Sequence, residues 1–132
     1  MTVANWKYKT LEELEHEYWK NNDAPTNLVK RCFELRKVPL DNFTIEGFRL
    51  IIGQQIGLAY LIPLALEILS DNLFAEGNYY EGDLLQNVLN IDLVFWRNNK
   101  SLWQNLDQLL KNKSEQLNER KISLSKFYSI NI

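Results

Sequence analysis

The most apolar run of the chain lies between Leu50 and Leu69, and the other predicted elements are arranged around it. Glycine, glutamine and proline interrupt this run, whereas a membrane crossing needs about 20 predominantly apolar residues in succession. The run instead predicts two consecutive buried helices, the first ending at the segment GQQIG and the second carrying PLALEIL. We expect this pair to form a central apolar helical hairpin.

Two helices are predicted before this pair. Thr10 to Glu13 has the S/T-x-x-E form of a capping box, and the apolar spacing that follows predicts a helix from about Leu11 to Lys20. Asp23 or Thr26 then caps a second helix. We expect Pro39 to end it, because the residue before a proline is disfavoured in the helical region.

Within the hairpin, Thr44 is a good N-cap for a helix from Ile45 to about Gln55. Gly57 stands where a left-handed C-cap is expected. Pro63 is tolerated in the first turn of the following helix, which runs to about Ser70. The second helix is apolar nearly all round, which predicts a central position.

The part of the chain after the hairpin begins with an irregular loop, DNLFAEGNYYEGD. Asp83 is predicted to cap a helix that ends near Ile91, and a further helix is predicted from about Ser101 to Asn112. The tail, residues 113–132, is predicted to form a short helix and a docked extended end, or to fray in part. No stretch shows sustained strand alternation. We predict an all-α single-domain helical bundle of about six to seven helices that spans residues 1–132.

The composition is that of an ordinary globular protein. The 132 residues, 45% of them hydrophobic, suffice for one globular domain with its own core. Cys32 is the single cysteine, so no internal disulfide forms and a reducing cytosol is the expected compartment. The N-terminus shows no basic segment leading into an apolar run, so no secretory signal is expected. We therefore expect a cytoplasmic protein.

Charge is unevenly distributed although the net charge is only −2. Residues 1–49 carry eight acidic and eight basic side chains, residues 50–96 carry six acidic and no basic ones, and residues 97–132 carry seven basic and three acidic ones. An acidic central segment attracts a cationic partner and repels phosphate. It therefore disfavours nucleic acid, which a basic patch would bind.

Catalytic and metal-binding patterns are nearly absent from the sequence. His16 and Cys32 would form a nucleophilic pair only within hydrogen-bond reach of each other. The simpler interpretation is a buried apolar cysteine and a solvated histidine among glutamates. The acidic residues lack calcium-loop spacing, and no zinc motif is present. We expect no metal, no cofactor, no small-molecule substrate and no enzymatic activity.

The loop after the hairpin is the best candidate for a working surface because it is acidic and aromatic together. Tyrosine and tryptophan are enriched at interface centres, where they supply large contact areas. Alternatively, the tyrosines close over the bundle and the acids only solvate a loop. The predicted partner-binding residues, all in the acidic segment, are Glu67, Asp71, Glu76, Tyr79, Tyr80, Glu81, Asp83 and Asp92. Charge reversal at Glu76, Glu81 and Asp83 is expected to slow association while leaving the fold intact.

Three motifs carry a resemblance to a known family: KRCFELRKVPL, RLIIGQQIGLAYLIPLALEIL and AEGNYYEGDLL. They resemble the immunity proteins of bacterial contact-dependent growth inhibition systems, the CdiI group. The resemblance covers about Thr10 to Leu110 and is most specific in GQQIG and PLALE. The matching positions are Arg31, Cys32, Leu35, Arg36, Pro39, Leu40, Arg49, Ile52 to Leu58, Tyr60, Leu61, Pro63 to Leu66, Leu69, Ala75, Glu76, Gly77, Tyr80 and Gly82 to Leu85.

The resemblance implies a cytoplasmic protein that binds and blocks the C-terminal toxin domain of its cognate CdiA protein. The all-helical branch that it resembles is associated with RNase A-like ribonuclease toxins. A basic RNA-binding cleft on such a toxin would suit the acidic segment. Two other classes stay open: an enzyme that uses the carboxylates, and a nucleic-acid-binding module that uses the basic stretch from Arg97 to Lys126.

Overall fold

The computed structural model describes residues 3–20 and 25–130. Within these ranges the chain is all-helical, with nine α-helices, two 3-10 helices and one isolated β-bridge. The all-α prediction is confirmed, with more helices than the six to seven expected, because several segments expected as connections form short helices. In chain order the elements are η1 (Val3–Tyr8), α1 (Leu11–Glu15), α2 (Asn27–Leu35), η3 (Leu40–Asn42), α3 (Ile45–Gly53), α4 (Leu58–Asp71), α5 (Asp83–Leu89), α6 (Leu93–Arg97), α7 (Lys100–Leu110), α8 (Ser114–Glu119) and α9 (Ser125–Tyr128).

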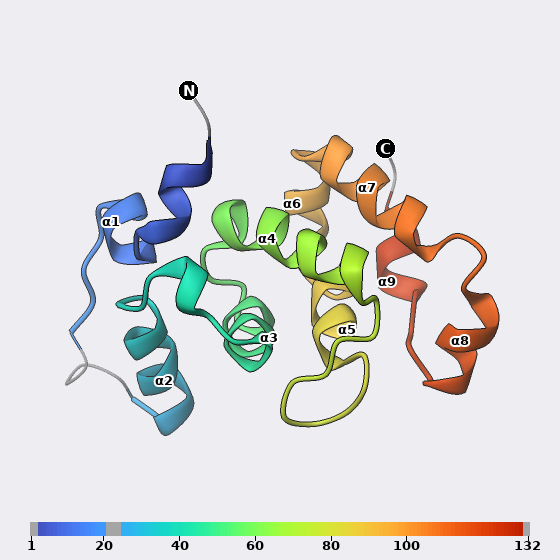
Figure 1. Cartoon of the computed structure of the whole chain (residues 1–132), viewed down its shortest axis with the longest axis horizontal. Coiled ribbons are helices and arrows are strands. Elements are labelled where there is room, and N and C mark those ends of the chain that lie inside the picture. The colour runs from blue at the N-terminus through green and yellow to red at the C-terminus, as the bar shows by residue number, and fades with distance from the viewer. Residues whose placement is uncertain (1–2, 21–24, 131–132) are drawn as a thin grey trace.

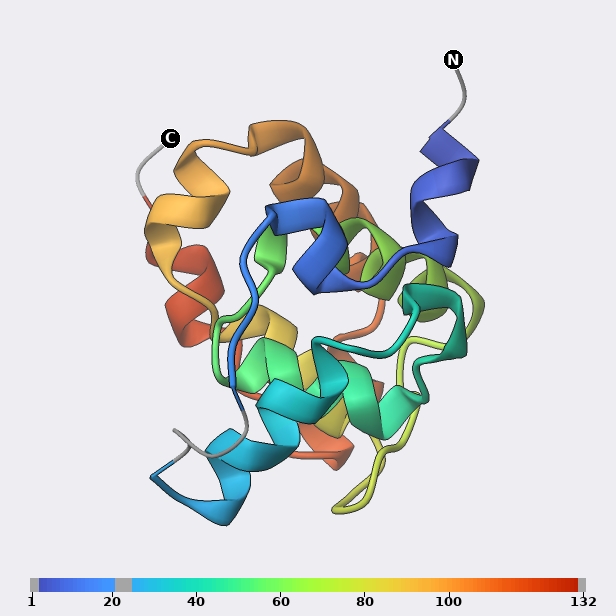
Figure 2. The same ribbon diagram turned by 90° about the vertical axis from the view of Figure 1, so that its left-hand side faces the viewer.

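Helices α3 and α4 form the predicted central pair. In Figure 1 α4 runs across the middle of the molecule while α3 is seen nearly end-on, and Figure 2 shows the reverse, so the two helices cross steeply. Helix α5 packs against α3, and α7 packs against α4. The buried side chains of the central pair include Phe48, Ile51, Ile52, Leu61, Ile62, Ala65, Leu66 and Leu69.

Helix α4 begins earlier than predicted. It starts at Leu58, so Pro63 lies in the helix interior and not in the first turn. A proline there leaves the carbonyl four residues earlier without its helical N–H partner. That carbonyl belongs to Ala59, which is exposed and can be hydrated. Leu61 and Ile62, directly before Pro63, are fully buried, which favours a helix that already begins at Leu58.

Gly57 adopts the predicted left-handed conformation, with φ of 66°, but it is the N-cap of α4 and not a C-cap of α3. Helix α3 ends at Gly53, and Gln55 is also left-handed, with φ of 58°. A Cβ atom at Gly57 would lie 2.8 Å from both terminal methyl carbons of Leu11. Glycine is therefore required here both by the backbone and by the packing of α1.

The first predicted helix is shorter than expected. Thr10 and Glu13 form the predicted capping box, but α1 ends at Glu15, and His16 is left-handed with φ of 55°. The segment after it leaves the helical path because Arg36 holds it. Arg36 donates to the carbonyl of Glu17 at 2.5 Å. This tertiary contact outweighs the local helical preference of residues 16–20.

The N-caps of the next two helices follow the sequence. Thr26 caps α2 by accepting a hydrogen bond from the backbone of Val29 at 3.1 Å, and Thr44 caps α3 by accepting one from Gly47 at 3.0 Å. Helix α2 ends at Leu35, before the boundary expected from Pro39. The alternative cap Asp23 lies outside the described residues.

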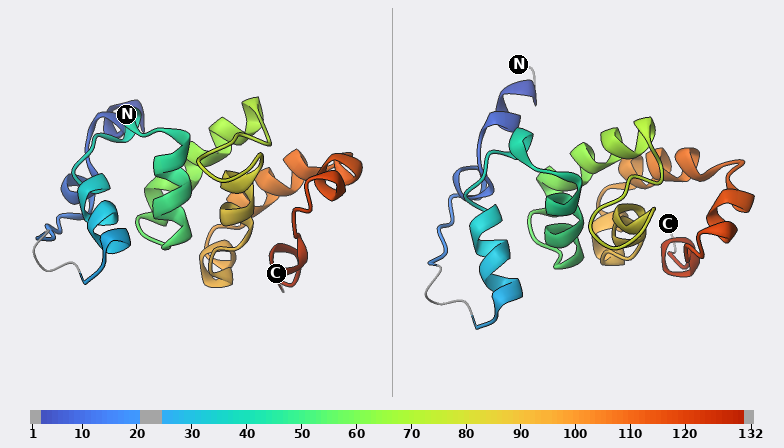
Figure 3. Two further views of the ribbon diagram at one scale, coloured as in Figure 1. Left: turned by 90° about the horizontal axis from the view of Figure 1, so that it is seen from below. Right: turned by 60° about the horizontal axis from the view of Figure 1, so that its bottom comes forward.

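The last two helices are docked onto the core. Phe127 of α9 is fully buried, with its ring centroid 5.5 Å from that of Trp96 and 5.0 Å from that of Trp103. Leu117 of α8 and Ile122 are buried as well. Figure 3 shows α8 and α9 at the end of the molecule opposite α1 and α2. The described part of the tail therefore forms two short helices that pack on the core.

Candidate partner-binding site

The predicted binding loop connects α4 to α5 and extends away from the helices (Figure 1). An isolated antiparallel bridge pairs Glu76 with Glu81 and closes its tip. Below the bridge, the backbone N–H of Gly82 donates to the carbonyl of Phe74 at 3.1 Å. Residues 72–82, which we call the binding loop, therefore have a defined hairpin-like path.

Two carboxylates bind four successive backbone N–H groups of this loop. The carboxylate of Asp83 accepts hydrogen bonds from Gly77 at 2.6 Å, from Tyr79 at 3.0 Å and from Tyr80 at 3.4 Å. Glu46 of α3 accepts one from Asn78 at 2.8 Å. Hydrogen bonds to charged acceptors are stronger than neutral ones, so the tip of the binding loop is firmly held.

Arg49 joins the two carboxylates. Its guanidinium donates two hydrogen bonds to Glu46, at 2.7 and 2.6 Å, and its Nε lies 3.9 Å from the carboxylate of Asp83. The same guanidinium lies 4.4 Å from the ring centroid of Tyr79. The hydrogen bonds from Arg49 lower the pKa of Glu46, and Glu46 in turn raises the pKa of Arg49. Glu46, Arg49, Tyr79 and Asp83 thus form one cluster.

The geometry corrects the expected role of Asp83. Gly82, with φ of 93°, is the N-cap of α5, and Asp83 is its first residue. The Asp83 side chain is 2% exposed and turns back to the binding loop. Charge reversal at Asp83 would therefore disrupt the loop and the fold, contrary to the expectation that the fold stays intact.

The binding loop presents two aromatic side chains to solvent. Tyr79 is 68% exposed and Tyr80 46%. Beside them lies a surface hollow of about 410 Å³ between the binding loop and helices α2, α3 and α5. The residues that line the hollow are Leu28, Arg49, Leu50, Gly53, Gln54, Tyr79, Tyr80, Asp83 and Asn87. Exposed rings beside a hollow are a suitable surface for another protein.

A second arginine holds the binding loop from the tail. Arg120 donates to Glu81 at 2.5 Å, and its guanidinium lies 4.1 Å from the ring centroid of Phe74. Gln86 and Ser123 exchange hydrogen bonds at 3.0 and 2.8 Å, which also join α5 to the tail. The acidic segment lacks basic residues in sequence, but the fold brings basic side chains to it.

The remaining predicted site residues lie at different places. Glu67 is exposed on α4 and forms an ion pair with Lys7 at 3.4 Å, away from the binding loop. Asp71 is the last residue of α4, directly before the loop. Asp92 caps α6 by accepting from Val94 at 2.9 Å. The structure therefore brings together Glu76, Tyr79, Tyr80, Glu81 and Asp83, and it separates Glu67 and Asp92 from them.

Glu46 and Arg49 are not among the site residues predicted from the sequence. Their three-residue spacing on one helix is a recognisable signal for an ion pair. Arg49 also belongs to the longest of the three resemblance motifs. Neither signal indicates that the pair lies beneath the binding loop, because that depends on how α3 packs against α5.

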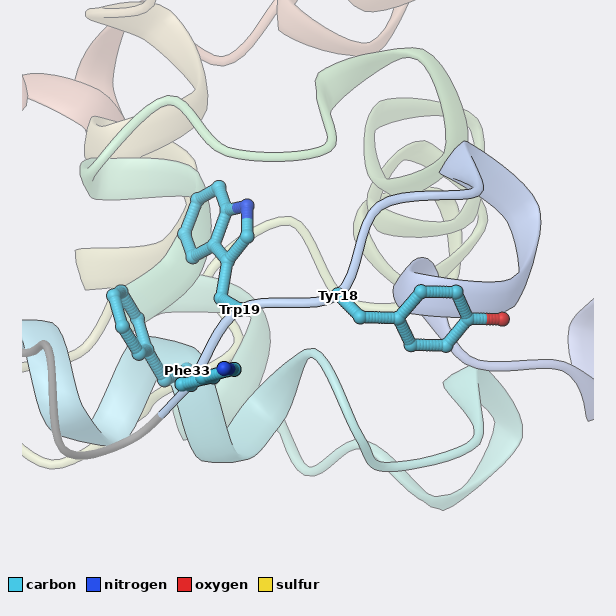
Figure 4. Close-up of a pocket in the computed structure, with 4 residues that line it drawn as sticks. Tyr18, Trp19 and Phe33 are labelled. Atoms are coloured by element: carbon cyan, nitrogen blue, oxygen red, sulfur yellow. The ribbon is translucent and has the colours of Figure 1, made fainter.

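Another hollow is lined by Tyr18, Trp19 and Lys20, from the segment after α1, and by Phe33 of α2. The ring centroids of Trp19 and Phe33 are 4.9 Å apart, and Figure 4 shows these rings together while Tyr18 points the other way. Lys20 is the last described residue before the gap at residues 21–24.

The candidate nucleophilic pair is not activated. Burial raises the pKa of the Cys32 thiol, which favours its unreactive protonated form. His16 is exposed on the segment after α1. Among the residues that the structure describes, no group of three or more histidine, cysteine or carboxylate side chains is arranged to hold a metal ion.

An all-helical fold that presents a firmly held aromatic loop beside a surface hollow is typical of a protein-binding module. The family model of the CDI immunity proteins matches residues 13–106, and the chain belongs to this family. Membership implies that the protein neutralises a cognate CdiA toxin as a non-enzymatic inhibitor. The comparisons with curated proteins and with solved structures found no match. None of the helices in the described ranges combines the length and the apolar character that a membrane crossing requires.

Proposed function

We propose that this protein binds the C-terminal toxin domain of its cognate CdiA protein through the binding loop and the adjoining hollow. The observation that supports this most is that Tyr79 and Tyr80 are exposed while four successive backbone groups beneath them are held by Glu46 and Asp83. Aromatic anchors on an ordered backbone lose little entropy on binding. The toxin-contacting set is Glu76, Tyr79, Tyr80 and Glu81, with Asp71 at its edge.

The toxin surface that fits this site is basic with an apolar centre. Asp71 and Glu76 are exposed and form no ion pair within the described residues, whereas Glu81 is paired with Arg120. Charge complementarity at the rim of an interface mainly increases the association rate. We therefore assign most of the affinity to the two tyrosines and most of the rate enhancement to the unpaired acids.

The toxin that we propose is an RNase A-like ribonuclease, as the resemblance of the three motifs implies. A ribonuclease needs a basic cleft to bind the phosphates of RNA. An acidic and aromatic loop seated over such a cleft would exclude RNA and stop catalysis. We further propose that this occurs in the cytoplasm of sibling cells, where an incoming toxin would meet RNA.

A co-expression experiment tests this proposal. The toxin domain encoded immediately upstream of this protein is expressed with the wild-type protein, with a Tyr79→Ala and Tyr80→Ala double variant, or with a Tyr8→Ala variant. Tyr8 is the matched control because it is an exposed tyrosine on η1, outside the site. We expect growth with the wild type and the control and arrest with the loop variant. Full rescue by the loop variant would place the toxin-binding surface elsewhere.

The toxin class is tested separately. RNA from cells that express the toxin domain alone should be degraded, and added immunity protein should prevent degradation of purified RNA by the toxin in vitro. Intact RNA in arrested cells would contradict the ribonuclease assignment while leaving the binding site untouched. Salt-sensitive RNA binding by the immunity protein alone would instead favour the nucleic-acid alternative at Arg97 to Lys126.

A further inference from the structure

The cluster beneath the binding loop contains more charge than a simple loop support requires. Glu46, Arg49 and Asp83 have side chains that are 15%, 13% and 2% exposed, so all three are largely removed from water. Removing charges from water is unfavourable unless their geometry is well matched. Glu46 accepts hydrogen bonds from Arg49 and from the loop N–H of Asn78. Asp83 accepts three loop N–H groups with Arg49 3.9 Å away, so the cluster is matched only when the loop has this shape.

Arg49 is the member of the cluster that contacts all the others. It bonds Glu46 through two nitrogens, lies near Asp83, and places its guanidinium plane against Tyr79. One face of the Tyr79 ring is therefore covered by the Arg49 guanidinium, whose side chain is only 13% exposed where it lines the hollow. A lysine cannot reproduce this arrangement, because its ammonium lacks the planar fork of the guanidinium.

We infer that Arg49 is a positioning residue for toxin binding: it holds the binding loop in its bound shape before the toxin arrives, and it acts through Tyr79. This inference rests on the proposed function. The physical basis is a conformational equilibrium of the loop. If only a fraction of the molecules has the loop shape that binds the toxin, the apparent affinity is reduced by that fraction. The loop residues thus dock as a preformed unit.

The first test needs only the wild-type protein. Amide hydrogen exchange is measured on the free protein and on its complex with the toxin domain. We expect the amides of Gly77, Asn78 and Tyr79 to exchange slowly in the free protein, because carboxylates accept their hydrogen bonds. Fast exchange in the free protein and slow exchange only in the complex would overturn the inference.

The second test is a double-mutant cycle. Affinity for the toxin domain is measured for Arg49→Lys, Tyr79→Ala and the double variant, with Arg97→Lys as a matched control because Arg97 is exposed on α6. We expect Tyr79→Ala to weaken binding about tenfold and Arg49→Lys about fivefold. The double variant should bind more tightly than two independent effects would predict, since the part of the Arg49 effect that passes through Tyr79 is lost when Tyr79 is absent. The control should bind like the wild type.

The outcomes separate this inference from the proposed function. Unchanged affinity in Tyr79→Ala would contradict the binding site itself. Weak binding by Tyr79→Ala together with a fully additive effect of Arg49→Lys would overturn only the role of Arg49. Thermal unfolding identifies a variant that has lost its fold; Glu46→Gln then replaces Arg49→Lys in the cycle, because it removes the charge that orients Arg49. The same lack of additivity is expected from it, and full additivity would again overturn the inference.

Discussion

The guanidinium of Arg36 lies 4.2 Å from the ring centroid of Trp19. Arg36 is 1% exposed and also bonds the side chain of Glu15 and the carbonyl of Glu17. It is therefore a buried cation that attaches the segment after α1 to the end of α2. Helix α1 itself has only five residues and depends on such contacts for its place.

Replacing Arg36 should destabilise the whole domain. We expect Arg36→Ala to lower the free energy of unfolding by about 2–4 kcal/mol, because it leaves a cavity beneath Trp19 and removes the partner of Glu15. Urea unfolding followed by tryptophan fluorescence measures this. Arg97→Ala, at an exposed position, should change the stability by less than about 0.5 kcal/mol. A small effect at both positions would show that Arg36 contributes no net stability.

Two glycines should respond to alanine with opposite signs. At Gly57 the φ of 66° and the close methyl carbons of Leu11 predict that Gly57→Ala destabilises the protein by about 2 kcal/mol or more. At Gly47, inside α3, a new Cβ would meet its nearest neighbours at 3.5 Å, an ordinary contact distance. Gly47→Ala should therefore stabilise by about 0.5–1 kcal/mol. Thermal unfolding of both variants compares them directly, and equal shifts would be inconsistent with the described backbone.

Acid should weaken the cluster beneath the binding loop. The pKa of Glu46 lies below its ordinary value of 4.5, chiefly because Arg49 donates to it. The charged carboxylate therefore stabilises the folded state above pH 4.5, and this contribution is lost as the pH falls through the lowered pKa. We expect the stability difference between wild type and Glu46→Gln to be complete at about pH 6 and to shrink below pH 4.5. A difference that stays constant into acid would contradict this; Glu115→Gln, at an exposed position, is the control.

Glu76, the unpaired acid of the binding loop, should affect the association rate with the toxin more than the lifetime of the complex. We expect Glu76→Lys to reduce the association rate constant about two- to fivefold at low salt, with a smaller effect at high salt. Asp41→Lys, on η3 and outside the site, is the charge-matched control. Stopped-flow mixing with the toxin domain measures both rates. A change confined to dissociation would place Glu76 inside the contact and not at its rim.

Features governed by neighbouring residues were predictable from the sequence. The threonine caps at Thr10, Thr26 and Thr44 each bind a backbone N–H three residues later, so the local pattern is sufficient. The burial of α3 and α4 follows from their apolar composition alone. The irregular segment between α4 and α5 was also predicted, because its glycines and the loss of helical periodicity mark it.

Features that depend on distant contacts were not predictable. The early end of α1 requires Arg36, twenty-one residues after Glu15 in the chain, to bond the segment that follows. Asp83 has the sequence position of a helix cap, but its side chain accepts a hydrogen bond from Gly77 of the loop. Arg49 of α3, 3.9 Å away, favours this orientation. The charge count of residues 50–96 likewise takes no account of Lys7 and Arg120. The fold brings these two basic side chains to Glu67 and Glu81.

The contact between the binding loop and the tail limits how this protein can be re-engineered. Arg120 and Ile122 lie beyond residue 106, where the family match ends, yet Arg120 holds Glu81 and a terminal carbon of Ile122 would lie 3.0 Å from a Cβ at Gly82. A loop transplanted alone from another immunity protein would meet a tail shaped for a different sequence. Under the proposed function, exchanging toxin specificity between relatives means moving the loop and residues 117–123 together.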